Sequence, residues 1–365
     1  MSSSTAATPG AATGATSSSG SADPSGRRLV FVVGSGRSGT STMSGTLQTL
    51  GIHVPQPEVR ADDTNPKGFG EPQWVVDLHD ELLRRCQVQV SDARPSAWFE
   101  AGKLATDEEL RERLHRWLEE QFAEGGSELV VKDPRLSWFL GLWRGAAVRA
   151  GATPSYITML RPVTEVVGSK QKYYSSRFGE VSRTAAWVNM MLHTERATRE
   201  GVRAFVRYHD LLSDWTVPLF AIGEQFGLQG VQTASANDIR KVHNFIDPSL
   251  RRVQATWEDL QVPPRLREVA DETWQALDAM AEPDGDTAEV RATLDQLRVA
   301  YTDLYDESEA LAQSSVIAAR RAGQRPAAPA AAVPARRVDR IPHGVRAAVP
   351  GPVRRGLRKA LGRER

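Results

Sequence analysis

A glycine- and hydroxyl-rich segment follows an apolar run near the start of the chain, in the sequence VFVVGSGRSGTST. It has the pattern G-x-x-x-x-G from Gly34 to Gly39. The backbone N–H groups of such a turn converge on a phosphate, and the N-terminus of a following helix adds the positive end of its dipole. We rank a plain surface turn below this interpretation, because a strand before and a helix after are the context that phosphate binding requires. The candidate anion-binding residues are Gly36, Arg37, Ser38, Gly39, Thr40 and Ser41.

Thr40 stands where the loop of a nucleoside triphosphatase would carry lysine. That lysine normally reaches the β- and γ-phosphates. Its absence argues against ATP-driven phosphoryl transfer and favours a ligand with less phosphate at this end. A P-loop kinase that uses ATP remains the alternative enzyme.

Arg161 and Ser169 form a second candidate anion site. Arg161 follows the apolar run SYITML, and Ser169 comes about two helical turns later, on the face along which Arg161 can fold back. The two side chains could therefore close on one anion. An arginine at a strand end is more often part of a structural ion pair, so this spacing alone is a weak signal.

Together these segments resemble the sulfotransferase family, most of all its bacterial branch. Four more segments are similar to that family: NPKGFGE, VVKDPR, VRYHDLLSDW and FIDPSLRR. The resemblance runs from about Leu29 to Arg252 and is specific as a set. It implies that the loop, with Arg37 in place of the usual lysine, binds the 5′-phosphosulfate of 3′-phosphoadenosine 5′-phosphosulfate (PAPS). It also implies that Arg161 and Ser169 bind the 3′-phosphate of this donor.

The implied reaction is an in-line displacement that moves a sulfuryl group to an acceptor hydroxyl. The acceptor would be a carbohydrate, a glycolipid or a small metabolite. Catalysis of this kind depends on positioning and on cations, without an obligatory metal. Arg37 and Lys132 are the expected cations, although a lysine at a strand end is also common on plain protein surfaces.

The proton acceptor is expected among two carboxylates. Many family members carry a histidine shortly after the strand-end lysine, but here Lys132 is followed by Asp133, Pro and Arg135. Glu71 is the first candidate, because other members are thought to use a glutamate upstream and because glycines flank this loop. The alternative for Glu71 is a solvated ion pair with Lys67. Asp133 is the second candidate base, and its alternative role is to order Lys132 and Arg135 by ion pairing.

The elements that must position these residues alternate along the chain. The runs RRLVFVVG, ELVV, SYITML and AFVRY predict four buried strands. Helices are expected over 41–50, 106–123, 164–176 and 183–198, and the remainder to about 311 is mainly helical. Thr106 and Glu109 predict a capping box for the second of these helices. The expected fold is α/β, a P-loop NTPase-like three-layer architecture with a parallel central sheet flanked by helices and with disordered tails.

Composition narrows the class of protein further. Hydrophobic residues make up 40% and charged residues 25%, which is ordinary for a globular domain. The single cysteine, Cys86, excludes an internal disulfide and fits a reducing compartment, so we expect a cytoplasmic protein. No apolar run is long enough for a transmembrane helix. We expect no metal site, because no cysteine, histidine and aspartate residues cluster at ligand spacing, and we expect no nucleic-acid partner.

The domain organisation follows from the ends of the chain. Residues 1–27 predict a disordered lead, residues 28–311 the domain, and residues 312–365 a basic Pro/Ala/Arg-rich tail. From residue 320 onward, thirteen basic and two acidic residues give a net charge of +11, which leaves −10 for the rest. Residues 345–365 could form a short helix on an anionic membrane surface, although a solvated tail is favoured because it lacks Trp and Phe. A non-catalytic anion-binding or membrane-associated adaptor is therefore the third candidate function.

Removal of the tail should leave the chemistry intact, since its composition offers no core. A variant that lacks residues 322–365 should keep the melting temperature and the turnover of a water-soluble acceptor. Its binding to anionic vesicles, measured by co-sedimentation, should fall below that of the full chain and depend on salt. A large loss of thermal stability would contradict this interpretation.

Overall fold

The computed structural model describes residues 26–62, 65–173, 179–247 and 254–323. The predicted lead up to residue 25 and the tail from residue 324 onward lie outside the described residues. The chain divides into two compact units between Asp306 and Glu307.

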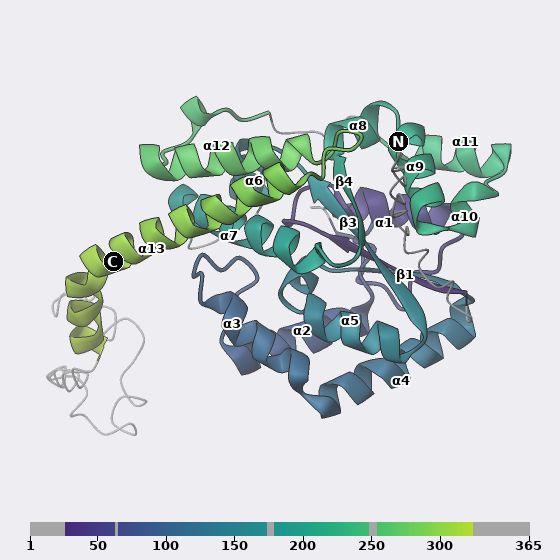
Figure 1. Cartoon of the computed structure of the whole chain (residues 1–365), viewed down its shortest axis with the longest axis horizontal. Helices are drawn as coiled ribbons and strands as arrows, with labels where there is room; N and C mark the ends of the chain where they lie inside the picture. The colour runs from purple at the N-terminus through teal and green to yellow at the C-terminus, as the bar shows by residue number, and fades with distance from the viewer. Residues whose placement is uncertain (1–25, 63–64, 174–178, 248–253, 324–365) are drawn as a thin grey trace, which may run out of the picture. The chain divides into compact units, whose positions relative to one another are not determined.

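Four parallel strands form one sheet in the order β2-β1-β3-β4 (Figure 1). The strands are β1 (Arg27–Val33), β2 (Glu128–Lys132), β3 (Ala152–Leu160) and β4 (Val202–Arg207). Their register places Val30 of β1 beside Val130 of β2 and Ser155 of β3. The middle of each strand is mostly apolar and buried, because helices cover both faces of a parallel sheet. All four predicted strands are confirmed.

The helices form a layer on each face of the sheet. Leu29 and Phe31 of β1 point into a core shared with one group of helices, and Val30 and Val32 point into a second core on the opposite face. The first group consists of α2 (Gln73–Cys86), α3 (Ala97–Gly102), α4 (Glu108–Gly125) and α5 (Leu140–Arg149). The second group consists of α1 (Thr40–Thr49), α8 (Tyr208–Ser213), α9 (Thr216–Phe226), α10 (Gln229–Gln232) and α11 (Ala236–Phe245). This alternation confirms the predicted α/β class with three layers.

A third core lies where β3 and β4 end. Leu160 and Phe205 pack there against one more group of helices. That group is α6 (Val163–Tyr173), α7 (Glu180–Thr198), α12 (Pro264–Ala279) and the first part of α13 (Ala288–Gly323). The proposed domain end at residue 311 falls within α13. In the second unit, the residues of α13 from Glu307 to Arg321 are all exposed.

The start of α4 differs from the prediction. The helix begins at Glu108, and the carboxylate of Asp107 caps it by accepting a hydrogen bond of 3.1 Å from the backbone N–H of Leu110. Thr106 instead ends a short 3₁₀ turn, where its hydroxyl donates to the carbonyl of Lys103. The predicted capping box of Thr106 and Glu109 is therefore wrong, because the preceding turn carries the chain one residue further before the helix starts. The apolar residues of this helix are buried: Leu110, Leu114, Trp117, Leu118 and Phe122.

Three helices of the layer over the first core, α2, α3 and α5, have no counterpart in the sequence-based prediction. The first of them contributes Leu78 and Leu82 to this core, and the last contributes Leu142 and Trp143. The helices that the sequence did predict are present, with ends shifted by a few residues, which is normal for boundaries inferred from sequence.

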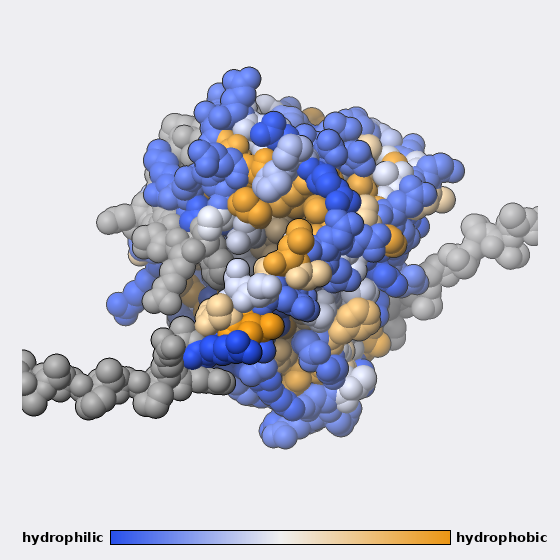
Figure 2. Space-filling model, turned by 90° about the vertical axis from the view of Figure 1, so that its left-hand side faces the viewer, coloured by the Kyte–Doolittle hydropathy of each residue, from blue (hydrophilic) through white to orange (hydrophobic). Residues whose placement is uncertain are grey.

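The surface mixes apolar and hydrophilic residues. On the face in Figure 2, orange apolar residues appear in groups among blue hydrophilic ones. Large exposed apolar side chains lie on separate elements, among them Phe99 on α3, Val148 on α5 and Val217 on α9. Exposed apolar side chains that lie on separate elements in this way are normal for folded proteins. Within the described ranges, no helix has both the length and the apolar character needed to cross a bilayer.

Candidate active site

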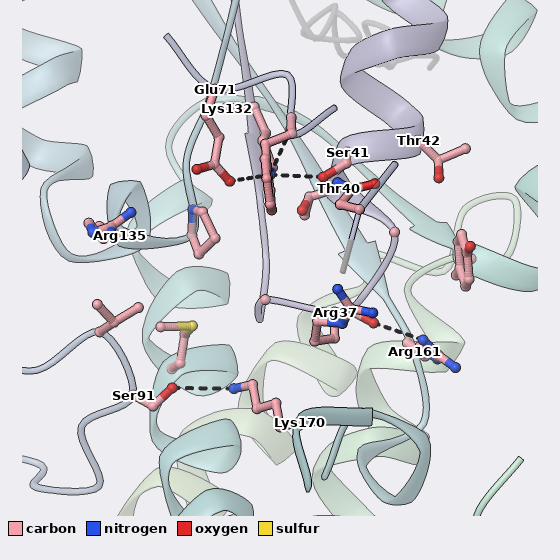
Figure 3. Close-up of a pocket in the computed structure, with 18 of the residues that line it drawn as sticks. Arg37, Thr40, Ser41, Thr42, Glu71, Ser91, Lys132, Arg135, Arg161 and Lys170 are labelled. Carbon is pink, nitrogen blue, oxygen red and sulfur yellow. Dashed lines mark hydrogen bonds and ion pairs between the residues drawn. The ribbon is translucent and has the colours of Figure 1, made fainter. Parts of the chain in front are cut away.

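A cavity of about 650 Å³ opens at the carboxyl ends of the strands. Every strand contributes a residue at or shortly after its end. These residues are Gly36 in the loop after β1, Lys132 at the end of β2, Arg161 after β3 and Tyr208 after β4. Lys132 and Arg161 are labelled in Figure 3. Loops gather at this edge in every open parallel sheet, which makes it the usual place for a ligand. Lys132 ends β2 at this edge and lines the cavity.

The loop after β1 contains three glycines, and its conformation requires two of them, Gly34 and Gly39. Both have positive φ angles, 122° at Gly34 and 90° at Gly39. A Cβ atom at Gly39 would lie 2.1 Å from the ring of Tyr208, and one at Gly34 would lie 2.7 Å from the carbonyl oxygen of Met159. No other residue fits either position without displacing its neighbour.

The N-terminus of α1 faces the cavity. Thr40, Ser41 and Thr42 of its first turn line the cavity wall, and no side chain caps the helix at Gly39. The first N–H groups of a helix have no partner within the helix, so this end can bind an anion. Ser38 is buried beneath the wall, where its hydroxyl has no hydrogen-bond partner among the described residues.

Arg161 and Ser169 meet at Arg37. One guanidinium nitrogen of Arg161 (NH1) donates to the backbone carbonyl of Arg37 at 3.0 Å, and its Nε donates to the carboxylate of Glu165 at 2.8 Å. The Nε of Arg37 donates to the hydroxyl of Ser169 at 3.1 Å. The structure thus brings the three predicted anion-binding residues together. Arg161 lines the cavity and Ser169 is buried behind Arg37.

Lys132 and Glu71 form a buried ion pair at the cavity wall. The Nζ of Lys132 lies 2.5 Å from Oε1 of Glu71, 3.0 Å from the carbonyl oxygen of Phe69 and 3.1 Å from the hydroxyl of Ser41. Their side chains are 2% and 9% exposed. The solvated pair between Glu71 and Lys67 is not formed, because Lys67 donates instead to the backbone carbonyl of Phe245. Among the described residues, no hydrogen bond reaches the second carboxylate oxygen of Glu71, Oε2.

Asp133 does not line the cavity. It is fully buried, with one oxygen 2.8 Å from Nδ1 of His79 and the other accepting from the backbone and guanidinium of Arg135. The Nε1–H of Trp143 donates to Nε2 of His79, so the proton on His79 sits on Nδ1 and is donated to Asp133. This geometry makes Asp133 a positioning residue for Arg135 and argues against the catalytic role predicted for it.

Several residues of the cavity were missed from the sequence. Lys170 follows Ser169 directly, Arg183 lies on α7, and Tyr208 packs on Gly39 with the guanidinium of Arg161 5.4 Å from its ring centre. Tyr208 falls inside the segment VRYHDLLSDW, which could have pointed to it. Lys170 falls within the segment that carries Arg161 and Ser169 but was given no role, and Arg183 stands in no motif.

The cavity is strongly cationic. Its basic residues are Arg37, Lys132, Arg135, Arg161, Lys170 and Arg183, and Glu71 is the single carboxylate among the described residues that line it. Clefts lined by one sign of charge concentrate ligands of the opposite sign. No group of three or more His, Cys, Asp or Glu side chains in the described part of the chain could hold a metal ion. The arrangement suits an organic anion with several charges.

Two solved structures are similar in fold. The sulfotransferase domain of the Synechococcus PCC 7002 olefin synthase is 15% identical in sequence, with a TM-score of 0.41 over 69% of this chain and 94% of that one. The sulfotransferase domain from the curacin biosynthetic pathway is also 15% identical, with a TM-score of 0.40 over 69% of this chain and 98% of that one. No protein-family model and no curated protein matches the sequence. TM-scores this low give no information about function. A functional conclusion therefore depends on the residues of the cavity.

The pair of Asp133 and His79 should support stability. We expect Asp133→Asn to lower the free energy of unfolding by about 3 kcal/mol, since it removes the charged partner of a buried network. Asp80→Asn is the matched control, because Asp80 is the half-exposed partner of the same Arg135, and it should cost about 0–1 kcal/mol. Urea unfolding at neutral pH measures both values. Equal, small losses would contradict the role of Asp133.

The pH dependence of this effect has a definite sign. Burial alone would raise the pKa of Asp133, but the hydrogen bond from His79 and the charge of Arg135 outweigh it and hold the pKa below its usual range. A carboxyl group with a lowered pKa stabilises the fold above its unfolded pKa of about 3.9 and loses this contribution as the pH falls through the folded value. The difference in stability between the parent and Asp133→Asn should therefore shrink in acid.

Proposed function

We propose that this protein is a sulfotransferase that moves a sulfuryl group from PAPS to a hydroxyl group of an acceptor. The observation that carries the proposal is the buried contact of Lys132 with Glu71 beside the N-terminus of α1. It places a cation and a carboxylate with one unengaged oxygen next to a site suited to an anion. The cation that the loop lacks at Thr40 is supplied by Lys132 from the neighbouring strand, 3.1 Å from Ser41.

In the proposed reaction, the loop N–H groups and Arg37 hold the 5′-phosphosulfate of the donor. The acceptor hydroxyl gives its proton to Oε2 of Glu71 as its oxygen forms a bond to sulfur. The bond between sulfur and the bridging oxygen breaks, and its electron pair stays on the 5′-phosphate. Lys132 and Arg37 stabilise the charge that accumulates there, which is where fixed cations have their largest effect.

The three protons of the Lys132 ammonium are already matched by three acceptors. A bound donor oxygen would replace the hydroxyl of Ser41, while Glu71 and the carbonyl of Phe69 keep the lysine in place. The charged lysine therefore needs little reorganisation when the donor arrives, and preorganisation of this kind is what lowers a barrier.

The 3′-phosphate of the donor is assigned to Arg161 and Ser169. Arg161 would exchange part of its contact with Glu165 for the phosphate, and charge-assisted bonds to phosphate favour such an exchange. The acceptor is a carbohydrate, a glycolipid or a small metabolite. Because the single cysteine suits a reducing compartment, we place the reaction in the cytoplasm.

Donor binding tests the proposal. Arg161→Ala should weaken the binding of 3′-phosphoadenosine 5′-phosphate by about 2 kcal/mol, the cost of a lost charge-assisted hydrogen bond. Adenosine 5′-phosphate lacks the 3′-phosphate and should bind the variant and the parent alike. Glu165→Gln is the control, because it frees Arg161 without removing it and should not weaken either ligand. Calorimetry measures all three.

Two results of this experiment would overturn the proposal. An equal loss for both nucleotides would make Arg161 a structural residue. Preferential binding of Mg-ATP by the parent would replace the sulfotransferase with a kinase.

Glu71→Gln should lower kcat by about 10²–10⁴-fold, the usual contribution of a general base. The substitution keeps the size of the side chain and one acceptor oxygen for Lys132 but cannot take a proton. Donor binding should be unchanged, and the acidic limb of the pH–rate profile should disappear. The measurement is kcat per folded protein for Glu71→Gln and Asp133→Asn side by side. Retained activity in Glu71→Gln, with a collapse in Asp133→Asn, would reverse the assignment.

A further inference from the structure

The guanidinium group of Arg135 is held on two sides. Its Nε donates to the carboxylate of Asp80 at 2.7 Å, and its Nη1 donates to the buried carboxylate of Asp133 at 3.0 Å. The third nitrogen, Nη2, makes no hydrogen bond to any of the described residues. The side chain is 20% exposed and lines the cavity. Arg135 is therefore fixed in place and keeps two N–H donors on Nη2 for a ligand in the cavity.

Arg135 lies on the same side of the cavity as the proposed base. In Figure 3, Arg135 and Glu71 occupy one side, whereas Arg37, proposed to hold the donor, lies on the other. Pro134, directly before Arg135, borders the loop after β1, since a Cβ atom added at Gly36 would lie 3.8 Å from its ring. An acceptor hydroxyl has to reach both this loop and Oε2 of Glu71. The atoms next to that hydroxyl then come within reach of Arg135.

The positive charge of Arg135 is already compensated by the protein. Burial lowers the pKa of the guanidinium, but the surrounding carboxylates, Asp133 foremost, outweigh it and raise the pKa. The ion pairs on this side of the cavity join two cations to three carboxylates: Lys132, Arg135, Glu71, Asp80 and Asp133. An excess of negative charge disfavours an anionic group here. A neutral oxygen atom can still accept a hydrogen bond from Nη2.

We propose that Arg135 binds a second oxygen atom of the acceptor, next to the hydroxyl that receives the sulfuryl group, and that it thereby selects a neutral, hydroxyl-rich acceptor. The inference rests on the proposed function, because Oε2 of Glu71 fixes where the reacting hydroxyl lies. While that hydroxyl gives its proton to Glu71, Nη2 of Arg135 donates to the neighbouring oxygen. The vicinal oxygens of a carbohydrate have this spacing. A simple alcohol would displace water from Nη2 and leave its donors unpaired, which is costly.

Three acceptors built on one ring test the inference. They are cyclohexanol, the vicinal trans-diol of the same ring, and the ring with a carboxylate beside the hydroxyl. Transfer from labelled PAPS gives kcat/KM for each. The parent should favour the diol over cyclohexanol about tenfold or more, the effect of one hydrogen bond from a charged group, and should disfavour the hydroxycarboxylate. A ratio between acceptors does not depend on the folded fraction, so a merely structural role of Arg135 would leave it unchanged.

Two variants separate the hydrogen bond from the charge. Arg135→Lys keeps a cation beside Asp80 and Asp133 but removes the planar fork of donors, so its preference for the diol should fall to about twofold or less. Asp80→Asn keeps Arg135 and removes a compensating carboxylate, so the hydroxycarboxylate should gain about threefold or more relative to the diol. Arg113→Lys is the matched control, because Arg113 pairs with Glu81 and does not line the cavity. It should keep the ratios of the parent.

Each outcome decides the inference. It is overturned if the parent turns over cyclohexanol or the hydroxycarboxylate as well as the diol, if it labels other alcohols but not the diol, or if Arg135→Lys keeps the preference. Weaker binding of 3′-phosphoadenosine 5′-phosphate to Arg135→Lys would also overturn it, since Arg135 would then serve the donor. If Arg135→Lys does not fold, Asp80→Asn decides, and unchanged ratios in that variant contradict the selection for a neutral acceptor. If the parent labels no hydroxyl compound at all, the proposed function itself fails.

Discussion

The buried ammonium group of Lys132 is the interaction on which the site depends. A charge that is 2% exposed is tolerated only when it is paired and fully hydrogen-bonded, and here Glu71, Phe69 and Ser41 supply the three acceptors. These acceptors come from the loop before α2 and from the first turn of α1, while the lysine ends β2. One cation therefore ties three segments together at the edge of the sheet. The same contact places a carboxylate beside the end of α1, so the stability of this corner and its chemistry have a common origin.

The phosphate-binding loop shows a second constraint of the same kind. Arg37 has a φ angle of 77°, a conformation that costs a non-glycine residue about 1–3 kcal/mol. Its carbonyl is held by Arg161 and its guanidinium by Ser169. The residues proposed to bind the 3′-phosphate thus also stabilise the backbone of the loop proposed to bind the 5′-phosphosulfate.

The cations of the cavity differ in how the protein compensates their charge. Lys132, Arg135 and Arg161 each contact a carboxylate that fixes their position. Lys170 contacts hydroxyl groups and faces Arg183. Carboxylate partners hold a cation ready without a ligand, whereas a cation with neutral partners gains most when an anion binds.

The sequence by itself determined the α/β class, the four strands and the presence of a glycine-rich turn after β1. These features follow from short-range patterns, since apolar runs specify buried strands and glycines specify positive φ angles. Tertiary structure decided which side chains meet. Glu71 and Lys132 are 61 positions apart, and His79 and Asp133 are 54 apart, so no local pattern records either contact. Arg183 belongs to no motif, and only the packing of α7 at the edge of the sheet brings it into the cavity. The backbone pattern is encoded locally, but the pairing of charges depends on how distant segments pack.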